Sequence, residues 1–293
     1  MTKRILIQFL FLFIALTAFT QDIPLNENYS IACHNCYLKK PGTSIEDVFQ
    51  YTSNIEIDIY DSKFFMSKKN RLSGDWYVRH NPFFARTANN CCGGTFKDCL
   101  LKIKAWSERN PMHGLITVFI DKKEKWNSIS GQRTPADLDQ LLRSVFPGKE
   151  IFTPADLKGN ATSLSEVIQN NTWPGTDAVK GKIAFFVTDS RFFGSRNKLL
   201  DDYTDARQQG AVCFVAPEIK KEKEIAEPHG ISEKNRQFIV CYNLGHKKEY
   251  LISAINNRHY LIRLFGGDET PERLNLLKRQ KVNFIAIDNY TLH

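Results

Sequence analysis

The chain has 293 residues, of which 42% are hydrophobic and 25% charged, and its formal net charge is +8. This length fits one large domain better than two small ones, and it can bury a sizeable core without metal or disulfide staples. The basic residues are spread along the chain. This distribution argues against a nucleic-acid-binding protein but would assist approach to an anionic membrane surface.

The N-terminus has the layout of a secretory signal peptide. A short basic start with Lys3 and Arg4 precedes an apolar run over residues 5–19, and Gln21-Asp22 is the expected cleavage neighbourhood. The apolar run is shorter than the ~20 residues that a spanning helix needs, although an uncleaved anchor is the alternative. We therefore expect a signal peptide over residues 1–21, a mature domain over residues 22–293, and a secreted or periplasmic protein.

Strand-like and helix-like segments alternate along the mature sequence. The predicted strands are residues 29–33, 54–60, 76–80, 115–121, 182–188, 211–216, 238–243, 260–264 and 283–288. Alternation implies a parallel sheet, and the lack of a glycine-rich turn after the first strand favours a barrel over a doubly wound sheet. We predict an α/β protein with a single (β/α)8 TIM barrel, which need not be regular. Because there are nine candidates for eight places, 211–216 or 238–243 is expected to be an accessory element.

Three helix starts can be predicted from capping residues. Thr95 precedes an amphipathic segment over residues 96–109, with Asp98 at the position of a capping box. Thr134-Pro135 and Thr270-Pro271 each place a capping residue before a proline at the first helical position.

Seven cysteines in an exported chain suggest disulfides, and the odd number leaves at least one thiol unpaired. Cys99 is expected to pair with Cys91 or Cys92 in one short loop. Cys33 and Cys36 form a C-x-x-C motif, for which a zinc or redox role has little support because no second half-site accompanies it.

Polar residues occur at the carboxyl ends of the first four predicted strands. They are His34 and Asn35 after the first strand, Glu56 and Asp58 in the second, His80 at the end of the third, and Asp121 at the end of the fourth. In a parallel barrel these ends converge on one face. Glu56 and Asp58 are two apart, so they point to the same side, and the isoleucines between and beside them point to the outer helices. A buried carboxylate needs a cation or a basic partner.

The residue types suggest the chemistry. Asn35, Glu56, Asp58 and Asp121 offer only oxygen ligands, which suit calcium or magnesium rather than zinc. Two histidines beside them suit proton transfer near neutral pH. A histidine at a strand end often has only a structural role, and a pair of acids often lies on the protein surface. Such a non-functional explanation would have to hold for all four predicted strands at once. A metal site with two histidines, and without a recognisable motif for a serine or cysteine nucleophile, points to phosphoryl transfer.

The pattern His34-Asn35-x-Tyr37, Glu56-x-Asp58, His80 and an acid ending the next strand resembles calcium-dependent phosphatidylinositol-specific phospholipase C. Residues 94–100, 115–124, 134–156, 262–263 and 284–288 look like the bacterial secreted branch of that family. The resemblance implies that Asn35, Glu56, Asp58 and Asp121 bind Ca²⁺. It also implies that His34 stabilises the phosphorane or takes the proton of the inositol 2-hydroxyl, that His80 is the general acid, and that Arg263 lies near the ligand. Diacylglycerol and a cyclic inositol phosphate would be the products.

Two departures bear on the substrate and the metal. The family usually has glutamate where this chain has Asp121, which is one methylene shorter. Forms that prefer highly phosphorylated inositides carry lysines after the fifth strand, and residues 185–189 contain none. We therefore expect plain phosphatidylinositol, or a glycosylated form of it, as the substrate.

Other interpretations stay open at this point. A glycerophosphodiester phosphodiesterase shares the barrel but normally has His-Arg-Gly where this chain has His34-Asn35-Cys36. Calcium-independent phospholipases place an arginine where the metal sits, and a barrel that binds a head group without turnover is the non-enzymatic alternative. The expected partner is a phospholipid substrate at a membrane surface, contacted by residues 64–66, 83–84 and 192–193. We expect a monomer without nucleic acid or an obligate protein partner.

Overall fold

The computed structural model describes residues 22–38, 44–61, 75–80, 90–91, 94–126, 133–189, 198–267 and 270–288. The expected signal peptide and the three candidate membrane-contact segments lie outside these ranges. Within them, no helix combines the length and the apolar character needed to cross a membrane.

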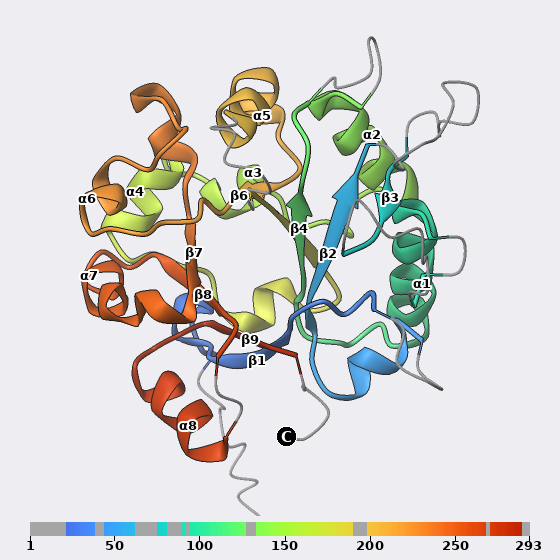
Figure 1. The fold of residues 1–293 in the computed structure, drawn as a ribbon. Coiled ribbons are helices and arrows are strands. Elements are labelled where there is room, and N and C mark those ends of the chain that lie inside the picture. Colours follow the sequence, from blue (N-terminus) through green and yellow to red (C-terminus); the bar gives the residue numbers. More distant parts are fainter. Residues whose placement is uncertain are drawn as a thin grey trace, which may run out of the picture.

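Strands from both halves of the chain form two sheets with helices around them (Figure 1). One sheet has the order β3-β2-β4-β5-β6 and the other the order β1-β9-β8-β7. The strands are β1 (Ser30–Cys33), β2 (Asn54–Tyr60), β3 (Tyr77–Val78), β4 (Ile116–Lys122), β5 (Ile183–Thr188), β6 (Phe214–Val215), β7 (Cys241–Gly245), β8 (Leu261–Phe265) and β9 (Phe284–Ile287). Every pairing is parallel except that of β2 with β3. The fold is therefore α/β with mainly parallel sheets.

The two sheets approach each other on two sides. Isolated parallel bridges join Val215 to Ile239 and Glu218 to Asn243, beside β6 and β7. On the other side, Thr52 Oγ1 donates to the Ile31 carbonyl, 2.6 Å away, next to β1 and β2. Without β3, the parallel strands follow one another in chain order around both sheets.

The expectation about the accessory strand was wrong. Residues 211–216 and 238–243 contribute to β6 and β7, which pair in parallel with β5 and β8. Phe214 on β6 stacks on Phe186 in the interior of the protein. The accessory strand is β3, which pairs antiparallel with β2 through Ile59 and Val78. Apolar periodicity predicts a strand but not its direction.

The three helices begin after the predicted capping residues, although the reciprocal bond of a capping box is found at Thr134 and not between Asp98 and Thr95. Thr95 accepts a hydrogen bond from the Asp98 amide, Thr134 forms a capping box, and Thr270 accepts from the Arg273 amide. The α-helices are α1 (Phe96–Arg109), α2 (Pro135–Val145), α3 (Pro154–Lys158), α4 (Leu164–Gln169), α5 (Leu199–Arg207), α6 (Lys223–Ala226), α7 (Ile252–Asn256) and α8 (Pro271–Arg279). Short 3₁₀ helices are Leu25–Glu27, Asp47–Gln50, Thr176–Val179, Gln208–Gly210, Glu233–Phe238 and His246–Leu251.

The core has an outer and an inner layer. Ile55, Ile57 and Ile59 on β2 share the outer layer with helix residues such as Leu100 and Leu138. The inner layer contains Ala32, Phe119, Phe186 and Phe284 among others, with the rings of Phe119 and Phe186 stacked 4.8 Å apart. Since alternate strand residues point to opposite faces, Glu56 and Asp58 share the inner face with this second layer.

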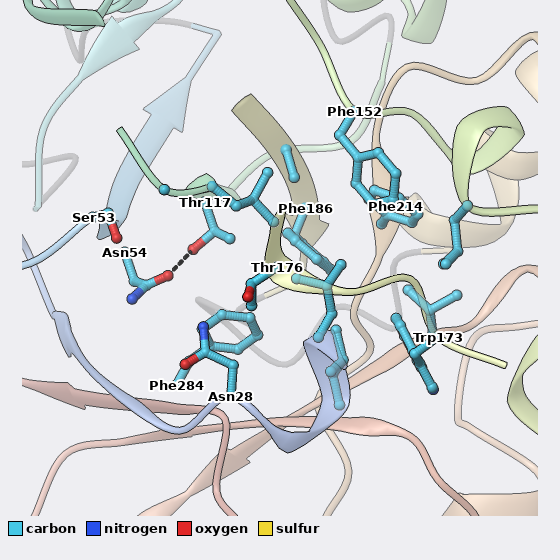
Figure 2. A pocket seen from close by; sticks show the side chains of 17 residues that line it. Asn28, Ser53, Asn54, Thr117, Phe152, Trp173, Thr176, Phe186, Phe214 and Phe284 are labelled. Atoms are coloured by element: carbon cyan, nitrogen blue, oxygen red, sulfur yellow. Dashed lines mark hydrogen bonds between the residues drawn. The ribbon is translucent and has the colours of Figure 1, made fainter. Parts of the chain in front are cut away.

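A mostly apolar cavity of about 120 Å³ lies at the amino ends of the strands (Figure 2). Its walls include Phe152, Phe186 and Trp173, and its polar edge holds Asn54, whose Oδ1 accepts a hydrogen bond of 2.7 Å from Thr117 Oγ1. Asn54 begins β2, so the cavity is about 13 Å along that strand from Asp58. The charged residues predicted from the sequence are therefore at the other end of the sheet.

Candidate active site

Three of the predicted residues form one buried acidic cluster. Glu56, Asp58 and Asp121 are each buried, and one carboxylate oxygen from each lies within 4.8 Å of the others. The register explains this closeness, because Asp58 on β2 is paired directly with Asp121 on β4. The sheet itself therefore fixes the spacing of the three acids.

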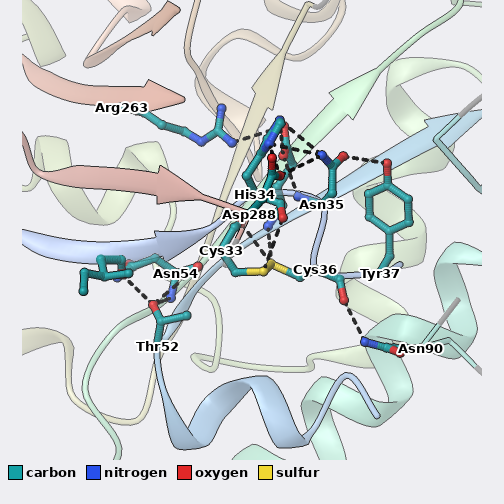
Figure 3. The surroundings of a disulfide bond; sticks show 12 residues. Cys33, His34, Asn35, Cys36, Tyr37, Thr52, Asn54, Asn90, Arg263 and Asp288 are labelled. Atoms are coloured by element: carbon teal, nitrogen blue, oxygen red, sulfur yellow. Dashed lines mark hydrogen bonds and ion pairs between the residues drawn. A yellow bond between two sulfur atoms is a disulfide. The ribbon is translucent and has the colours of Figure 1, made fainter. Parts of the chain in front are cut away.

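His34 and Asn35 lie on a tight turn after β1, closed by a disulfide between Cys33 and Cys36 (Figure 3). Asn35 has a φ of 57°, in the left-handed region that asparagine tolerates better than most residues. In this conformation its backbone amide donates a hydrogen bond of 3.1 Å to Glu56 Oε2. The turn is thus attached to the acidic cluster.

A second disulfide joins Cys99 to Cys91, one of the two partners that the sequence left open. Cys92 lies outside the described residues. Cys213 and Cys241 are buried free thiols. Burial raises the pKa of both, so neither has the character of a nucleophile.

His34 lies between two carboxylates. Its Nδ1 is 2.7 Å from Asp288 Oδ1 (Figure 3). Its Nε2 is 3.5 Å from Glu56 Oε2. Asp288 follows β9, and sequence analysis did not assign it to the site. The available signal was an acid directly after an apolar strand, the same pattern that identified Asp121.

His80 reaches the same cluster because β3 runs antiparallel to β2. The Arg79 amide donates to the Asp58 carbonyl, so the next residue returns to the level of Asp58. His80 Nδ1 lies 3.1 Å from Asn35 Oδ1, 3.2 Å from the hydroxyl of Tyr37 and 3.7 Å from Asp58 Oδ2. Asp58 raises the pKa of His80, although partial burial opposes the shift. The imidazole is more than half exposed and can meet a substrate.

Arg263 lies under the cluster on β8. Its Nη2 is 3.1 Å from Glu56 Oε1, its Nη1 donates to Asn243 Oδ1 at 2.8 Å, and its guanidinium is 5.0 Å from the ring centre of Phe119. Burial alone would raise the pKa of Glu56, but Arg263, His34 and Lys123 hold it below its usual value. Glu56 is therefore a stable carboxylate. The side chain of Arg263 is only 1% exposed.

Lys123, which sequence analysis did not single out, contacts the other two acids. Its Nζ is 2.6 Å from Asp121 Oδ2 and 3.2 Å from Asp58 Oδ2. Burial, together with the negative charges of Asp121 and Glu56, raises the pKa of Asp58, while Lys123 and His80 oppose that shift. At Asp58, burial and the neighbouring acids therefore outweigh the two cations.

The cluster has the chemistry of a calcium site. Its donors are carboxylate oxygens, and Asn35 adds an amide oxygen next to His80. Oxygen ligands suit hard cations, and three carboxylates so close together repel one another unless a cation lies near them. The residues present fit calcium.

A family model described as Ca²⁺-dependent phosphoinositide phospholipase C matches residues 87–273. The chain belongs to this family. The matched stretch contains Asp121 and Arg263 but begins after His80. The family consists of phosphodiesterases that depend on calcium, so the buried acids occur in a chain for which calcium is the expected cofactor.

Solved structures of similar proteins match most of the chain. A calcium-dependent phosphoinositol-specific phospholipase C from Pseudomonas sp., solved as a myo-inositol complex, is 29% identical; 92% of each chain is covered, with a TM-score of 0.82. A Ca²⁺-dependent phosphatidylinositol-specific phospholipase C from Streptomyces antibioticus is 21% identical, covers 92% of this chain and 96% of its own, and has a TM-score of 0.73. The second likeness shows the fold alone. A comparison with curated proteins gave no match.

Proposed function

We propose that this phospholipase cleaves phosphatidylinositol, or a glycosylated form of it, to diacylglycerol and a cyclic inositol phosphate. The observation that carries the proposal is the buried cluster of Glu56, Asp58 and Asp121 with His34 and His80 at its sides. Family membership and the similarity to a phospholipase solved with myo-inositol support an inositol head group.

The three acids and Asn35 would hold the calcium ion. When bound, calcium lowers the pKa of the inositol 2-hydroxyl and screens the charge that develops on the phosphate. Asp121 is one methylene shorter than the glutamate usual in the family, but its pairing with Asp58 in the register brings its carboxylate to the cluster. This supports Asp121 as a ligand despite its length.

His34 would take the proton of the attacking hydroxyl. Asp288 holds Nδ1, which leaves Nε2 on the side of Glu56 and the cluster. A carboxylate on one ring nitrogen fixes the tautomer and stabilises the imidazolium that forms, as expected for a general base. Stabilising the phosphorane is the second role for the same ring.

His80 would protonate the diacylglycerol oxygen as it leaves. A bond forms between the inositol 2-oxygen and phosphorus, and the bond from phosphorus to the diacylglycerol oxygen breaks. One proton passes to His34 and another comes from His80, so the charges balance. The raised pKa of His80 supports this role because it favours the protonated ring.

Arg263 was expected to bind the substrate, and a direct contact stays a prediction. Its burial and its ion pair with Glu56 support a different proposal, in which the guanidinium holds Glu56 ionised and in place. The end of β5 supports plain phosphatidylinositol over more phosphorylated forms. Thr188 and Asp189 lie there, and an acid would repel additional phosphates.

The finer features of the architecture belong to the same proposal. We infer that the eight parallel strands close into a single (β/α)8 TIM barrel over residues 22–293, interrupted where β1 meets β2 and where β6 meets β7.

The N-terminal pattern and the two disulfides support a signal peptide over residues 1–21 and secretion or a periplasmic location, since such bonds persist in oxidising compartments. We propose a monomer that acts on phospholipid at a membrane surface, without nucleic acid or an obligate protein partner.

Phosphorus NMR of the mature protein with phosphatidylinositol micelles tests the proposal. A cyclic inositol phosphate signal should appear with calcium, disappear with a chelator, and be absent in His80→Ala. Release of glycerol phosphate from glycerophosphodiesters, without turnover of phosphatidylinositol, would replace the proposal with the phosphodiesterase alternative. Calcium binding with no turnover of either substrate would indicate a head-group-binding barrel.

A further inference from the structure

Lys123 has an unusual position for a lysine beside a metal site. It follows β4 directly, and its backbone amide donates a hydrogen bond of 3.1 Å to the Ile59 carbonyl on β2. The side chain is 11% exposed, and its ammonium lies between two of the three acids, 2.6 Å from Asp121 Oδ2 and 3.2 Å from Asp58 Oδ2. The backbone attachment thus directs a cation into the acidic cluster.

This ammonium and a calcium ion compete for the same space. Calcium lies roughly 2.3–2.6 Å from carboxylate oxygens in proteins. A calcium ion bound by both Asp58 and Asp121 would therefore occupy almost the position that the Lys123 nitrogen takes between them. Two cations cannot share that position, because both their volumes and their charges oppose it.

The distribution of charge leads to the same conclusion. Arg263 contacts Glu56, on one side of the cluster, and Lys123 contacts Asp58 and Asp121 on the other. Without metal, these two cations offset most of the charge of three buried carboxylates. With calcium added, the Lys123 contact is redundant and repulsive.

We propose that Lys123 is a built-in cation of the calcium site, which the metal must displace in order to bind. The residue stabilises the metal-free protein and weakens its apparent affinity for calcium. It thereby sets the calcium concentration at which the site is filled. This inference rests on the proposed assignment of calcium to the acidic cluster.

Calcium titration calorimetry on the metal-free protein tests the inference. Lys123→Met removes the competing charge, and it should bind calcium at least about tenfold more tightly than the wild type. Lys125→Met is the matched control. Lys125 lies two residues after Lys123 and is exposed, so this substitution removes the same charge outside the acidic cluster. The control should stay within about twofold of the wild type.

Thermal unfolding provides a second measurement. In chelator, Lys123→Met should unfold at a lower temperature than the wild type, and saturating calcium should raise its unfolding temperature by more. Should Lys123→Met not fold, Lys123→Gln tests the same loss of charge with a polar side chain.

The outcomes separate the inference from the assignment of the metal. Tighter binding in Lys123→Met that is lost in the double variant with Asp58→Asn supports both. Unchanged or weaker calcium binding by a folded Lys123→Met, while the wild type binds at the cluster, overturns the inference alone. No calcium binding by either protein overturns the assignment and the inference together.

Discussion

The two ends of the central strands bury polar residues in different ways. At the amino end, Asn54 and Thr117 are neutral, form a hydrogen bond with each other, and adjoin a mostly apolar cavity. At the carboxyl end, on the same strands and the same inner face, Asp58 and Asp121 are ionisable acids, and the ammonium of Lys123 contacts both. The first arrangement satisfies itself within the fold. The second is incomplete without cations, as expected for a site that binds a metal and a charged substrate.

Asp58→Asn should give the largest effect, because it removes a proposed calcium ligand at the carboxyl end of the central strands. We expect turnover of phosphatidylinositol at a fixed calcium concentration to fall by about 10³ or more. In chelator, the variant should be at least as stable as the wild type, since burial and two neighbouring acids already disfavour the charged form. Turnover and thermal unfolding are the measurements, and wild-type activity would remove Asp58 from the metal site.

His80→Ala should lower turnover by about 10²–10⁴, the usual contribution of a general acid. The loss should shrink with a substrate whose leaving group is an acidic phenol, because such a group departs without protonation. His34→Ala is the matched variant and should show no such recovery, because His34 is proposed to accept the proton of the attacking hydroxyl and does not act on the leaving group. Equal recovery in both variants would contradict the division of roles.

Part of this site can be predicted from the sequence. The alternation of isoleucines and acids in β2 gives the inward face of Glu56 and Asp58, and Asp121 follows from its place at the end of the fourth predicted strand. These inferences depend on local periodicity, which neighbouring residues alone determine.

The remainder depends on contacts between distant segments. The direction of β3, which returns His80 to Asp58, is set by pairing rather than by its own residues. The ion pair of Arg263 with Glu56 joins β8 to β2, and Asp288 meets His34 only because β9 lies beside β1. Alternation places Lys123 on the face of Asp121, but its contact with Asp58 depends on the pairing of β4 with β2.

Thr117→Val tests the amino end of the central strands, where Asn54 and Thr117 form a hydrogen bond with each other. The substitution leaves the buried Oδ1 of Asn54 without the donor that Thr117 provides, so unfolding free energy should fall by about 1–3 kcal/mol. Turnover per folded molecule should not change, because the acids lie at the other end of the strands. Denaturant unfolding combined with turnover checks both statements, and a loss of activity without a loss of stability would contradict the comparison.

The smallest expected effect concerns the titration of His80. In the metal-free protein, NMR should give His80 a pKa above its ordinary value of 6.5, and Asp58→Asn should lower it. Because folding raises this pKa, the stabilisation from the pair is present at low pH and is lost as pH rises through the raised value. A pKa that does not respond to Asp58→Asn would show that the two groups do not interact.

The central claim is that the carboxyl ends of the strands hold the calcium ion on which the reaction depends. Crystals of the protein grown with calcium, measured at a long X-ray wavelength, would locate that ion by its anomalous signal. We predict a peak about 2.3–2.6 Å from carboxylate oxygens of Glu56, Asp58 and Asp121, with the ammonium of Lys123 moved away from it. A calcium peak elsewhere in an active protein, with Lys123 still between Asp58 and Asp121, would contradict the account.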